Sequence, residues 1–268
     1  MFDRPIAAFD IETIPDPDVG RRMHGFSGTD GEVLAAMIER RRVETEGRTE
    51  YPQLPHHRVV TVGMAWLDPK DGRFAFGTCG DAAMDEPSHL RGFFERCGQR
   101  QRPVRLVSWN GAGFDLPIIR YRSMLHGIAA PGFYRTDGDW KWNNYQNRFH
   151  DMHVDLMDVL SGYGASPRVG LGTLAPLLGL PDKSFLTKPI YDHVLAGEEQ
   201  PVREYCKLDC LETLLLYLVW SVHCGHLEPA KLRAHVDAIR SVLEAEPFEG
   251  WKGIAESLRG WPTWAQIE

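Results

Sequence analysis

The sequence lacks the features that mark several classes of protein. No apolar run approaches the roughly 20 residues that a membrane-spanning helix needs, and the N-terminus has no hydrophobic signal-peptide core. The five cysteines form no Cys-x-x-Cys pair, which favours buried thiols over a zinc site and indicates a reducing compartment. There is no internal repeat and no low-complexity tract. These absences predict a cytoplasmic protein that does not enter a membrane.

Positive charge is also scarce. The 268 residues carry a formal net charge of −7, which argues against a protein that coats nucleic acid by bulk electrostatic attraction. Hydrophobic residues make up 43% of the chain and charged residues 25%, as in an ordinary globular protein with a substantial core. Any binding to a strand of nucleic acid is therefore expected to be weak and salt-sensitive.

The order of the predicted elements indicates an α/β domain with a mixed sheet. Segments rich in β-branched and apolar residues predict strands at 5–10, 58–67, 73–79, 104–109 and 150–155. Helical periodicity predicts helices at 29–42, 87–98, 114–127, 155–162 and 199–223. We interpret 15–57 as an insertion in which loops flank the charged helix. The predicted domain covers 1–228, and a C-terminal extension, 229–268, is expected to pack on it.

Four carboxylates occur in three recognisable settings. Asp10 and Glu12 alternate in FDIET (residues 9–13), so both point to one face of the first strand. Asp115 ends NGAGFD (110–115), and Tyr205 and Asp209 in YCKLD (205–209) share one face of a helix. Carboxylate oxygens suit hard cations such as Mg²⁺ or Mn²⁺. Two such ions about 3.5–4 Å apart can clamp a phosphodiester, which is nuclease chemistry.

These three motifs, in this order, resemble those of the DEDD family of 3′–5′ exonucleases. The tyrosine matches the DEDDy branch, because the histidine branch needs a histidine five residues before the last aspartate, where this chain has Glu204. That branch includes the proofreading domains of family B DNA polymerases and stand-alone bacterial proteins related to them. The resemblance implies a ribonuclease H-like (DnaQ-like) mixed sheet flanked by helices, with a helical C-terminal extension.

The resemblance also implies roles for the carboxylates and the tyrosine. Asp10, Glu12 and Asp209 would hold one of two Mg²⁺ or Mn²⁺ ions, and Asp10 would also hold the second. Asp115 would act through a water or support the assembly. Tyr205 would orient the attacking water, because a phenol with a pKa of about 10 is a poor base at neutral pH. Each residue has a plainer alternative, such as a helix cap for Asp115 or an amphipathic aromatic for Tyr205.

Four further residues are candidates for binding the substrate. The resemblance places Asn110 and Phe114 against the 3′-terminal nucleotide, where an aromatic ring can stack on any base. Thr13 would contact the same nucleotide through its backbone amide, and Lys183 would meet phosphate. A turn position for Asn110, a core position for Phe114 and a solvated surface for Lys183 are the competing interpretations.

The predicted function is hydrolysis of single-stranded nucleic acid from its 3′ end to 5′-mononucleotides, with DNA favoured. The alternatives are a phosphodiesterase of short oligoribonucleotides and a catalytically idle nucleic-acid-binding module of the same fold. DNA and RNA differ in the 2′-hydroxyl, which no motif in the sequence addresses. A polar cluster formed by His150, Asp151, His153, Asp155 and Asp158 lacks metal-binding spacing and is expected to be a strand-to-helix junction.

Overall fold

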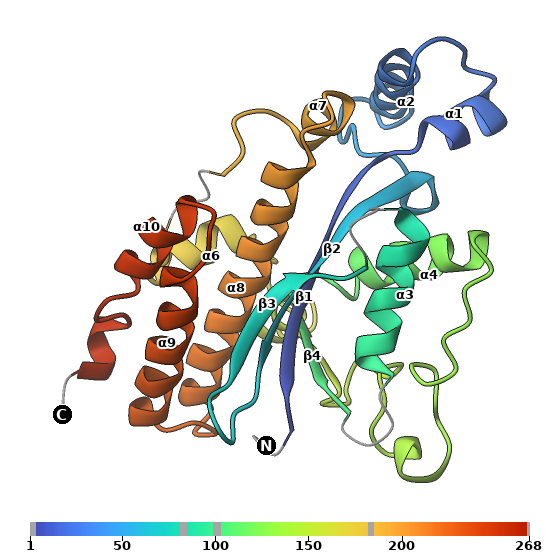
Figure 1. Ribbon diagram of the computed structural model, residues 1–268. Helices are drawn as coiled ribbons and strands as arrows, with labels where there is room; N and C mark the ends of the chain where they lie inside the picture. The colour runs from blue at the N-terminus through green and yellow to red at the C-terminus, as the bar shows by residue number, and fades with distance from the viewer. Residues whose placement is uncertain (1–3, 81–84, 99–102, 182–184, 267–268) are drawn as a thin grey trace.

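A mixed β-sheet forms the centre of the computed structural model, which describes residues 4–80, 85–98, 103–181 and 185–266 (Figure 1). Its five strands lie in the order β3-β2-β1-β4-β5. β2 is antiparallel to both of its neighbours, whereas β4 and β5 run parallel to β1. The strands are β1 (Ile6–Pro15), β2 (His57–Leu67), β3 (Phe74–Thr78), β4 (Arg105–Ser108) and β5 (His153–Asp155).

Helices cover both faces of this sheet (Figure 1). One layer holds α3 (Glu86–Cys97) and α4 (Asp115–Leu125), and the other is dominated by α8 (Glu199–His223), the longest helix. α6 (Leu171–Leu177), α9 (Pro229–Glu244) and α10 (Gly250–Ser257) belong to the α8 side. Further helical segments are α5 (Leu156–Leu160), α7 (Ile190–Leu195) and the short 3₁₀ turns Leu54–His56, Gly138–Lys141 and Thr263–Gln266.

The alternation of side chains along β1 builds two separate hydrophobic cores. Ile6 and Ala8 pack in the core that contains α8, whereas Ala7, Phe9 and Ile11 pack in the core that contains α3 and α4. Asp10 and Glu12 continue the series of Ile6 and Ala8. The sheet therefore directs both carboxylates toward α8.

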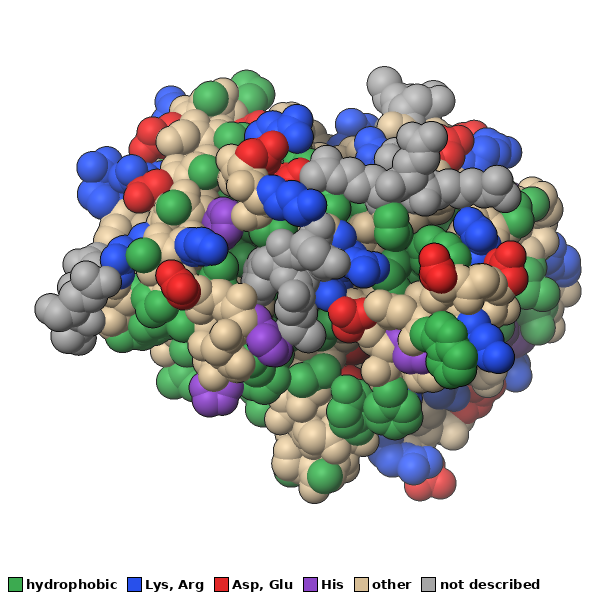
Figure 2. All heavy atoms as spheres, turned by 90° about the horizontal axis from the view of Figure 1, so that it is seen from below, with side chains coloured by type: hydrophobic (Ala, Val, Ile, Leu, Met, Phe, Trp, Pro, Cys, Tyr) green, Lys and Arg blue, Asp and Glu red, His purple; other side chains and the backbone are tan. Residues whose placement is uncertain are grey.

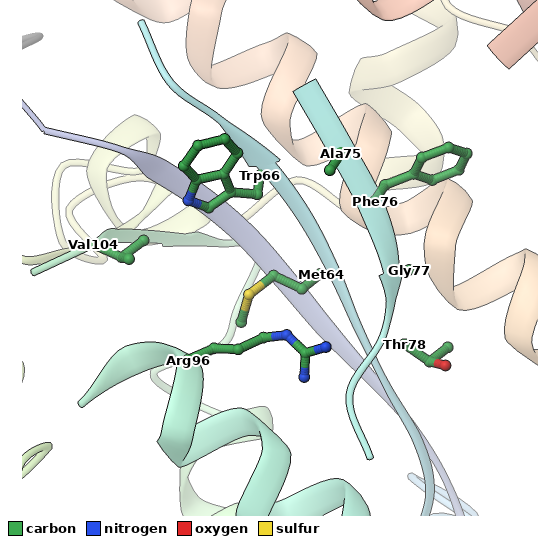
Figure 3. A pocket seen from close by; sticks show the side chains of 8 residues that line it. All are labelled: Met64, Trp66, Ala75, Phe76, Gly77, Thr78, Arg96 and Val104. Carbon is green, nitrogen blue, oxygen red and sulfur yellow. The ribbon is translucent and has the colours of Figure 1, made fainter. Parts of the chain in front are cut away.

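Strands β2 and β3 show the same alternation at the edge of the sheet. Met64 and Trp66 point toward α3 and line a hollow of about 300 Å³ together with Arg96 (Figure 3). Phe76 points to the opposite side (Figure 3). There its ring meets the indole of Trp251 edge-on, with 4.8 Å between the centroids.

The segment between β1 and β2 contains two helices where one was expected. α2 (Asp30–Glu44) matches the predicted charged helix, and Thr29 with Glu32 forms its capping box. The expectation of a loop before it is wrong, because α1 spans Pro17–His24. The Asp16 carboxylate caps α1, and Pro17 occupies the first turn, where a missing N–H costs nothing. α1 and α2 lie beyond one end of the sheet, near α7 (Figure 1).

The predicted α/β fold, a mixed sheet flanked by helices with a helical C-terminal part, is confirmed. In that C-terminal part Trp251 is buried and its indole N–H donates to the Glu204 carboxylate of α8. Lys207 lies between Glu204 and Glu246, at 2.9 and 3.3 Å. The boundary between 1–228 and 229–268 remains a prediction. Among the described residues, no helix combines the length and hydrophobicity needed to cross a membrane.

A buried ion-pair network joins the insertion to the α3–α4 layer. Arg122 of α4 lies 2.7 Å from a carboxylate oxygen of Asp16 and donates two hydrogen bonds, of 2.7 and 2.6 Å, to Glu86. Glu86 also accepts from the backbone N–H of Val59, at 2.7 Å, and lies 2.7 Å from the His126 ring. The Arg122, Asp16 and Glu86 side chains are each at most 6% exposed. The guanidinium therefore neutralises two carboxylates that water does not reach.

Replacing Arg122 by alanine is expected to destabilise the fold strongly. The substitution leaves two buried carboxylates without their cation, which costs about 3–5 kcal/mol in the free energy of unfolding. Urea denaturation of wild type and Arg122→Ala measures this loss. Arg259→Ala is the control, because Arg259 and its partner Glu256 are 61% and 68% exposed, and we expect no measurable change there. Equal losses of unfolding free energy in Arg122→Ala and Arg259→Ala would contradict the stabilising role of the buried ion-pair network.

Candidate active site

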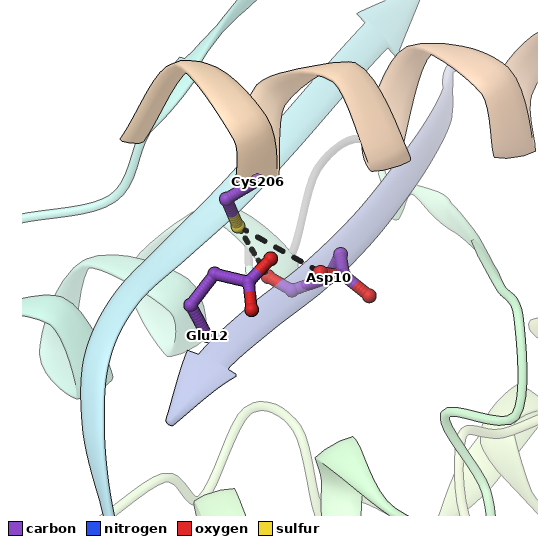
Figure 4. A group of neighbouring side chains, drawn as sticks. All are labelled: Asp10, Glu12 and Cys206. Carbon is purple, nitrogen blue, oxygen red and sulfur yellow. Dashed lines mark hydrogen bonds between the residues drawn. The ribbon is translucent and has the colours of Figure 1, made fainter. Parts of the chain in front are cut away.

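The first two carboxylates of the site lie at an irregular point of β1. Asp10 is half-buried and Glu12 is 7% exposed, and the pairing of β1 with β2 shifts register directly after Glu12. Such a bulge redirects the side chains beside it and is common next to active sites. Asp10 and Glu12 offer oxygen atoms that lie, with the sulfur of Cys206, within 4.8 Å of one another (Figure 4).

Helix α8 brings the third motif to the same place. It carries Tyr205, Cys206 and Asp209, and the Cys206 thiol lies 3.5 Å from the carbonyl oxygen and 3.8 Å from the carboxylate of Asp10. The helix approaches β2 closely at Gly63, the residue that pairs with Asp10 across the sheet. A Cβ on Gly63 would lie only 2.8 Å from the sulfur of Cys206. The missing side chain therefore permits this approach.

The second motif reaches the site from the other layer. Asp115 begins α4, and its carboxylate accepts a hydrogen bond of 3.0 Å from the backbone N–H of Ile11, which lies between Asp10 and Glu12. The preceding loop is held by Asp155, whose two carboxylate oxygens accept from the backbone N–H groups of Asn110 and Ala112, each at 2.9 Å. Asp155 also caps α5. The expected strand-to-helix junction is present, and it supports the motif-two loop.

The charges of three carboxylates act on a fourth, Asp10. Burial raises the pKa of Asp10 well above its usual value, and the charges of Asp115, Glu12 and Asp209 raise it further. Burial also raises the pKa of Asp115 to about 7, although hydrogen bonds from the backbone N–H groups of Ile11 and Asp115 itself lower it. Four carboxyl groups that repel one another in this way disfavour being charged together.

A divalent cation fits this donor set. The group that could hold it consists of Asp10 and Glu12 of β1 and the sulfur of Cys206 of α8, and the repulsion between the carboxylates is the interaction that a bound cation would reverse. The sulfur of Cys206 adds a softer donor, of the kind that zinc accepts and magnesium does not prefer. The geometry therefore provides a candidate metal centre around Asp10 and Glu12.

A cavity of about 540 Å³ opens beside these carboxylates. Thr13, Phe114 and Tyr205, one from each predicted motif, line it. His57 is a further lining residue: its ring accepts or donates at 2.9 Å from the Thr13 hydroxyl and meets the Phe114 ring edge-on, at 5.5 Å. Other walls come from Tyr51 of the insertion, Lys188 of the segment before α7 and Tyr191 of α7. The cavity has aromatic surfaces on several sides.

Substituting alanine for Gly63 tests the close packing of α8 on the sheet. The new Cβ would meet the sulfurs of Cys206 and Cys210, each at 2.8 Å, and the carbonyl oxygen of Cys206 at 3.1 Å. Because the backbone oxygen cannot turn away, the helix must shift, and we expect a loss of about 1–3 kcal/mol in unfolding free energy. Gly77→Ala is the matched control, since nothing lies within 4 Å of its Cβ position. Wild-type stability of Gly63→Ala would refute this packing.

The structure thus brings Asp10 and Glu12 together, with the charges of Asp115 and Asp209 acting on Asp10, and it places Thr13, Phe114 and Tyr205 along one cavity. Asn110 adopts a left-handed backbone conformation (φ 65°) and heads the loop that Asp155 holds. Lys183 lies outside the described residues. Sequence reasoning missed Cys206, although its spacing of three residues from Asp209 puts both on one helix face, and it missed His57. The catalytic and binding roles of all these residues remain predictions.

The chain matches one family of proteins over most of its length. Residues 49–257 match the family described as a predicted 3′–5′ exonuclease related to the exonuclease domain of PolB. The match covers more than half of the chain, so the chain belongs to that family. It includes Asp115, Tyr205 and Asp209, whereas Asp10 and Glu12 precede it.

One solved structure similar to this chain is the family B DNA polymerase from the hyperthermophilic archaeon Pyrobaculum calidifontis. It has 17% sequence identity and a TM-score of 0.48 over 90% of this chain. The chain corresponds to only 29% of the length of that polymerase chain. No curated protein matches the sequence significantly.

Proposed function

We propose that this protein is a metal-dependent 3′–5′ exonuclease of the DEDDy type. Its substrate is a single-stranded nucleic acid, with DNA favoured, and its product is a 5′-mononucleotide. The observation that carries the proposal is the acidic cluster around Asp10, where Glu12 lies close and the charges of Asp115 and Asp209 act, together with the cavity that Tyr205 lines. Membership of a family of predicted 3′–5′ exonucleases supports the same reaction.

The proposed roles follow from where the side chains lie. Asp10, Glu12 and Asp209 would hold one cation, and Asp10 would also help to hold a second. These cations would supply a water of lowered pKa and positive charge for the departing 3′ oxygen. Asp115 stays tied to the backbone of Ile11 and keeps α4 and β1 in register around the centre.

Tyr205 lies one helical turn before Asp209, and in this proposal its hydroxyl orients the attacking water rather than removing its proton. Attack on the last phosphodiester is in line, so the 3′ oxygen of the penultimate nucleotide leaves on the side opposite the water. The leaving oxygen takes up a proton from solvent. The phosphate remains on the 5′ oxygen of the released nucleotide.

The cavity is proposed to hold the terminal nucleotide. Phe114 offers a ring face, Thr13 and His57 offer polar groups, and Lys188 places a cation on the wall, 2.7 Å from the Glu198 carboxylate. Stacking on an aromatic ring accepts any base, so we expect little preference for the terminal base.

Chemical analysis of the products tests the reaction. A single-stranded oligonucleotide whose last two linkages are phosphorothioates, incubated with Mg²⁺ and the protein, should resist hydrolysis, while the unmodified strand releases 5′-mononucleotides. Products with a 3′-phosphate, or equal degradation of both strands from internal positions, would reject the proposed exonuclease. Chromatography of the nucleotides distinguishes these results.

A further inference from the structure

A second hollow, of about 350 Å³, lies against the loop that carries the second motif. Ala112, Gly113 and Leu116 line it from the loop and from the start of α4. Its remaining walls include three arginines, Arg120, Arg148 and Arg168, and a single acidic residue, Asp158. This concentration of positive charge is notable in a chain of net charge −7, on which acidic and basic side chains are interspersed over the face that Figure 2 shows.

The positive charges of this hollow are not fully neutralised. Arg148 and Arg168 both pair with the buried Asp158 carboxylate, at 2.8 and 2.6 Å. Arg120 makes no ion pair with any residue in the described part of the chain, and its buried Nε has no hydrogen-bond partner there. The nearby His153 stays neutral, because burial and the charge of Arg120 lower its pKa to about 4. Three guanidinium groups thus face one carboxylate.

An exposed aromatic pair extends the hollow onto the surface. Phe149 is 70% and Tyr163 is 43% exposed, and their rings lie 5.0 Å apart with the Arg148 guanidinium over both. Tyr163 adopts a left-handed conformation (φ 58°) in a turn where its N–H donates to the Asp158 carbonyl. Such a conformation is unfavourable for a bulky residue. The turn holds the ring outward, where it adds little to folding.

The arginine hollow and the acidic centre share one support. Asp155 holds the loop at Asn110 and Ala112 and caps α5, and Asp158, which pairs with two of the arginines, lies one turn further along. On the opposite side, Gly113 of the hollow is two residues from Asp115. The arginine hollow therefore adjoins the loop that carries the second motif, and the aromatic pair lies beside Arg148 at its rim.

We propose that Arg120, Arg148 and Arg168, with Phe149 and Tyr163, form a track that binds the single-stranded substrate upstream of its 3′ end. The inference rests on the proposed exonuclease function. The guanidinium groups bind backbone phosphates, and the aromatic pair stacks on unpaired bases. A duplex offers phosphates but no free base faces, so the track favours single strands. Hydrogen bonding to phosphate and stacking serve DNA and RNA alike.

Equilibrium binding in chelator, which prevents hydrolysis, tests the track on the full-length protein. Fluorescence anisotropy with 5′-labelled twelve-residue DNA and RNA strands, the corresponding duplex and a labelled mononucleotide gives Kd at several salt concentrations. We expect Phe149→Ala/Tyr163→Ala to raise Kd for both single strands about tenfold with an unchanged salt slope. Arg120→Gln should weaken binding and lower the slope of log Kd against log salt by about 0.7. If the substitutions weaken binding of the mononucleotide but not of the strands, the hollow is a site for a free anion and the track is wrong.

Matched controls come from the C-terminal part of the chain. Arg259→Gln and Trp264→Ala alter an exposed arginine and an aromatic residue of 41% exposure, and both should bind strands like wild type. The two track variants act on different side chains, so misfolding of one, seen in its circular dichroism, leaves the other as the test. If both fold and bind strands like the controls, the track is wrong.

Hydrolysis assays separate this inference from the proposed function. With Mn²⁺ present, the ratio of kcat/KM for the twelve-residue strand to that for a dinucleotide should fall about tenfold in the track variants, because a dinucleotide cannot reach the aromatic pair. If the track variants bind strands more weakly than wild type, but the wild-type protein cleaves nothing, the track is supported and the exonuclease is rejected. Full cleavage with an unchanged ratio would support the exonuclease and reject the track.

Discussion

Asp10→Asn is expected to lower the rate of strand hydrolysis by about 10³-fold or more, because this carboxylate is the one shared by both proposed cations. Loss of a metal that stabilises the transition state by several kcal/mol corresponds to a change of this size. Asp10 also lies centrally, since the charges of Asp115, Glu12 and Asp209 all act on it. Initial rates on a labelled single strand with Mn²⁺ measure the effect.

The stability of the same variant should change in the opposite direction. Asparagine removes a negative charge from a group of repelling carboxylates, so metal-free Asp10→Asn should melt at a higher temperature than metal-free wild type. Asp68→Asn is the control, because Asp68 is fully buried in the turn between β2 and β3, where its carboxylate accepts from the Lys70 N–H. We expect it to keep its activity and to melt lower. An inactive Asp10→Asn that is also less stable would indicate a structural role.

Metal binding is expected to stabilise the protein more at pH 8.0 than at pH 5.5. The folded pKa of Asp115, about 7, is above its unfolded value of 3.8, so the folded state holds this proton more tightly. The stability that this proton provides is complete below pH 3.8 and is lost as the pH rises through about 7. At 1.36 kcal/mol per pKa unit the loss between pH 5.5 and 8.0 is about 2 kcal/mol, and a bound cation offsets it.

The effect of Asp115 on stability has to be separated from the effect of buried histidines. Burial lowers the pKa of His57 and His153, and these groups destabilise the fold as the pH falls, opposite to Asp115. Melting temperatures of wild type and Asp115→Asn, with and without Mn²⁺ at both pH values, isolate the carboxylate. Without metal, wild type should lose more stability than Asp115→Asn between pH 5.5 and 8.0. Parallel pH profiles of the two proteins would contradict the pKa shift of Asp115.

Local patterns predicted the elements that carry the acidic residues. α8 begins and ends where helical periodicity placed it, at 199 and 223, and β2 differs from the expected 58–67 by one residue. Alternation along β1 predicted that Asp10 and Glu12 share a face, and the two cores on either side of the strand agree. These features depend on neighbours in the sequence, which is why they were predictable.

Features that depend on contacts between distant segments were not predictable in this way. Cys206 lies beside Asp10 because Gly63, on a different strand, lets α8 approach. The arginine hollow depends on the irregular segments around Arg148 and Arg168, which have no periodicity. Prolines at 15 and 17 favour a break in regular structure, but Asp16 followed by Pro17 is also a favourable helix start, and α1 begins there.

Digestion of 5′-labelled single-stranded DNA and RNA with Mg²⁺ or Mn²⁺ tests the exonuclease most directly. A ladder that shortens one nucleotide at a time from the 3′ end, and disappears with chelator or with Asp10→Asn, is the predicted result. The two strands compared under one condition also give the sugar preference. Intact strands of either kind at every time point, with Mn²⁺ bound to the folded protein, would contradict the proposed function.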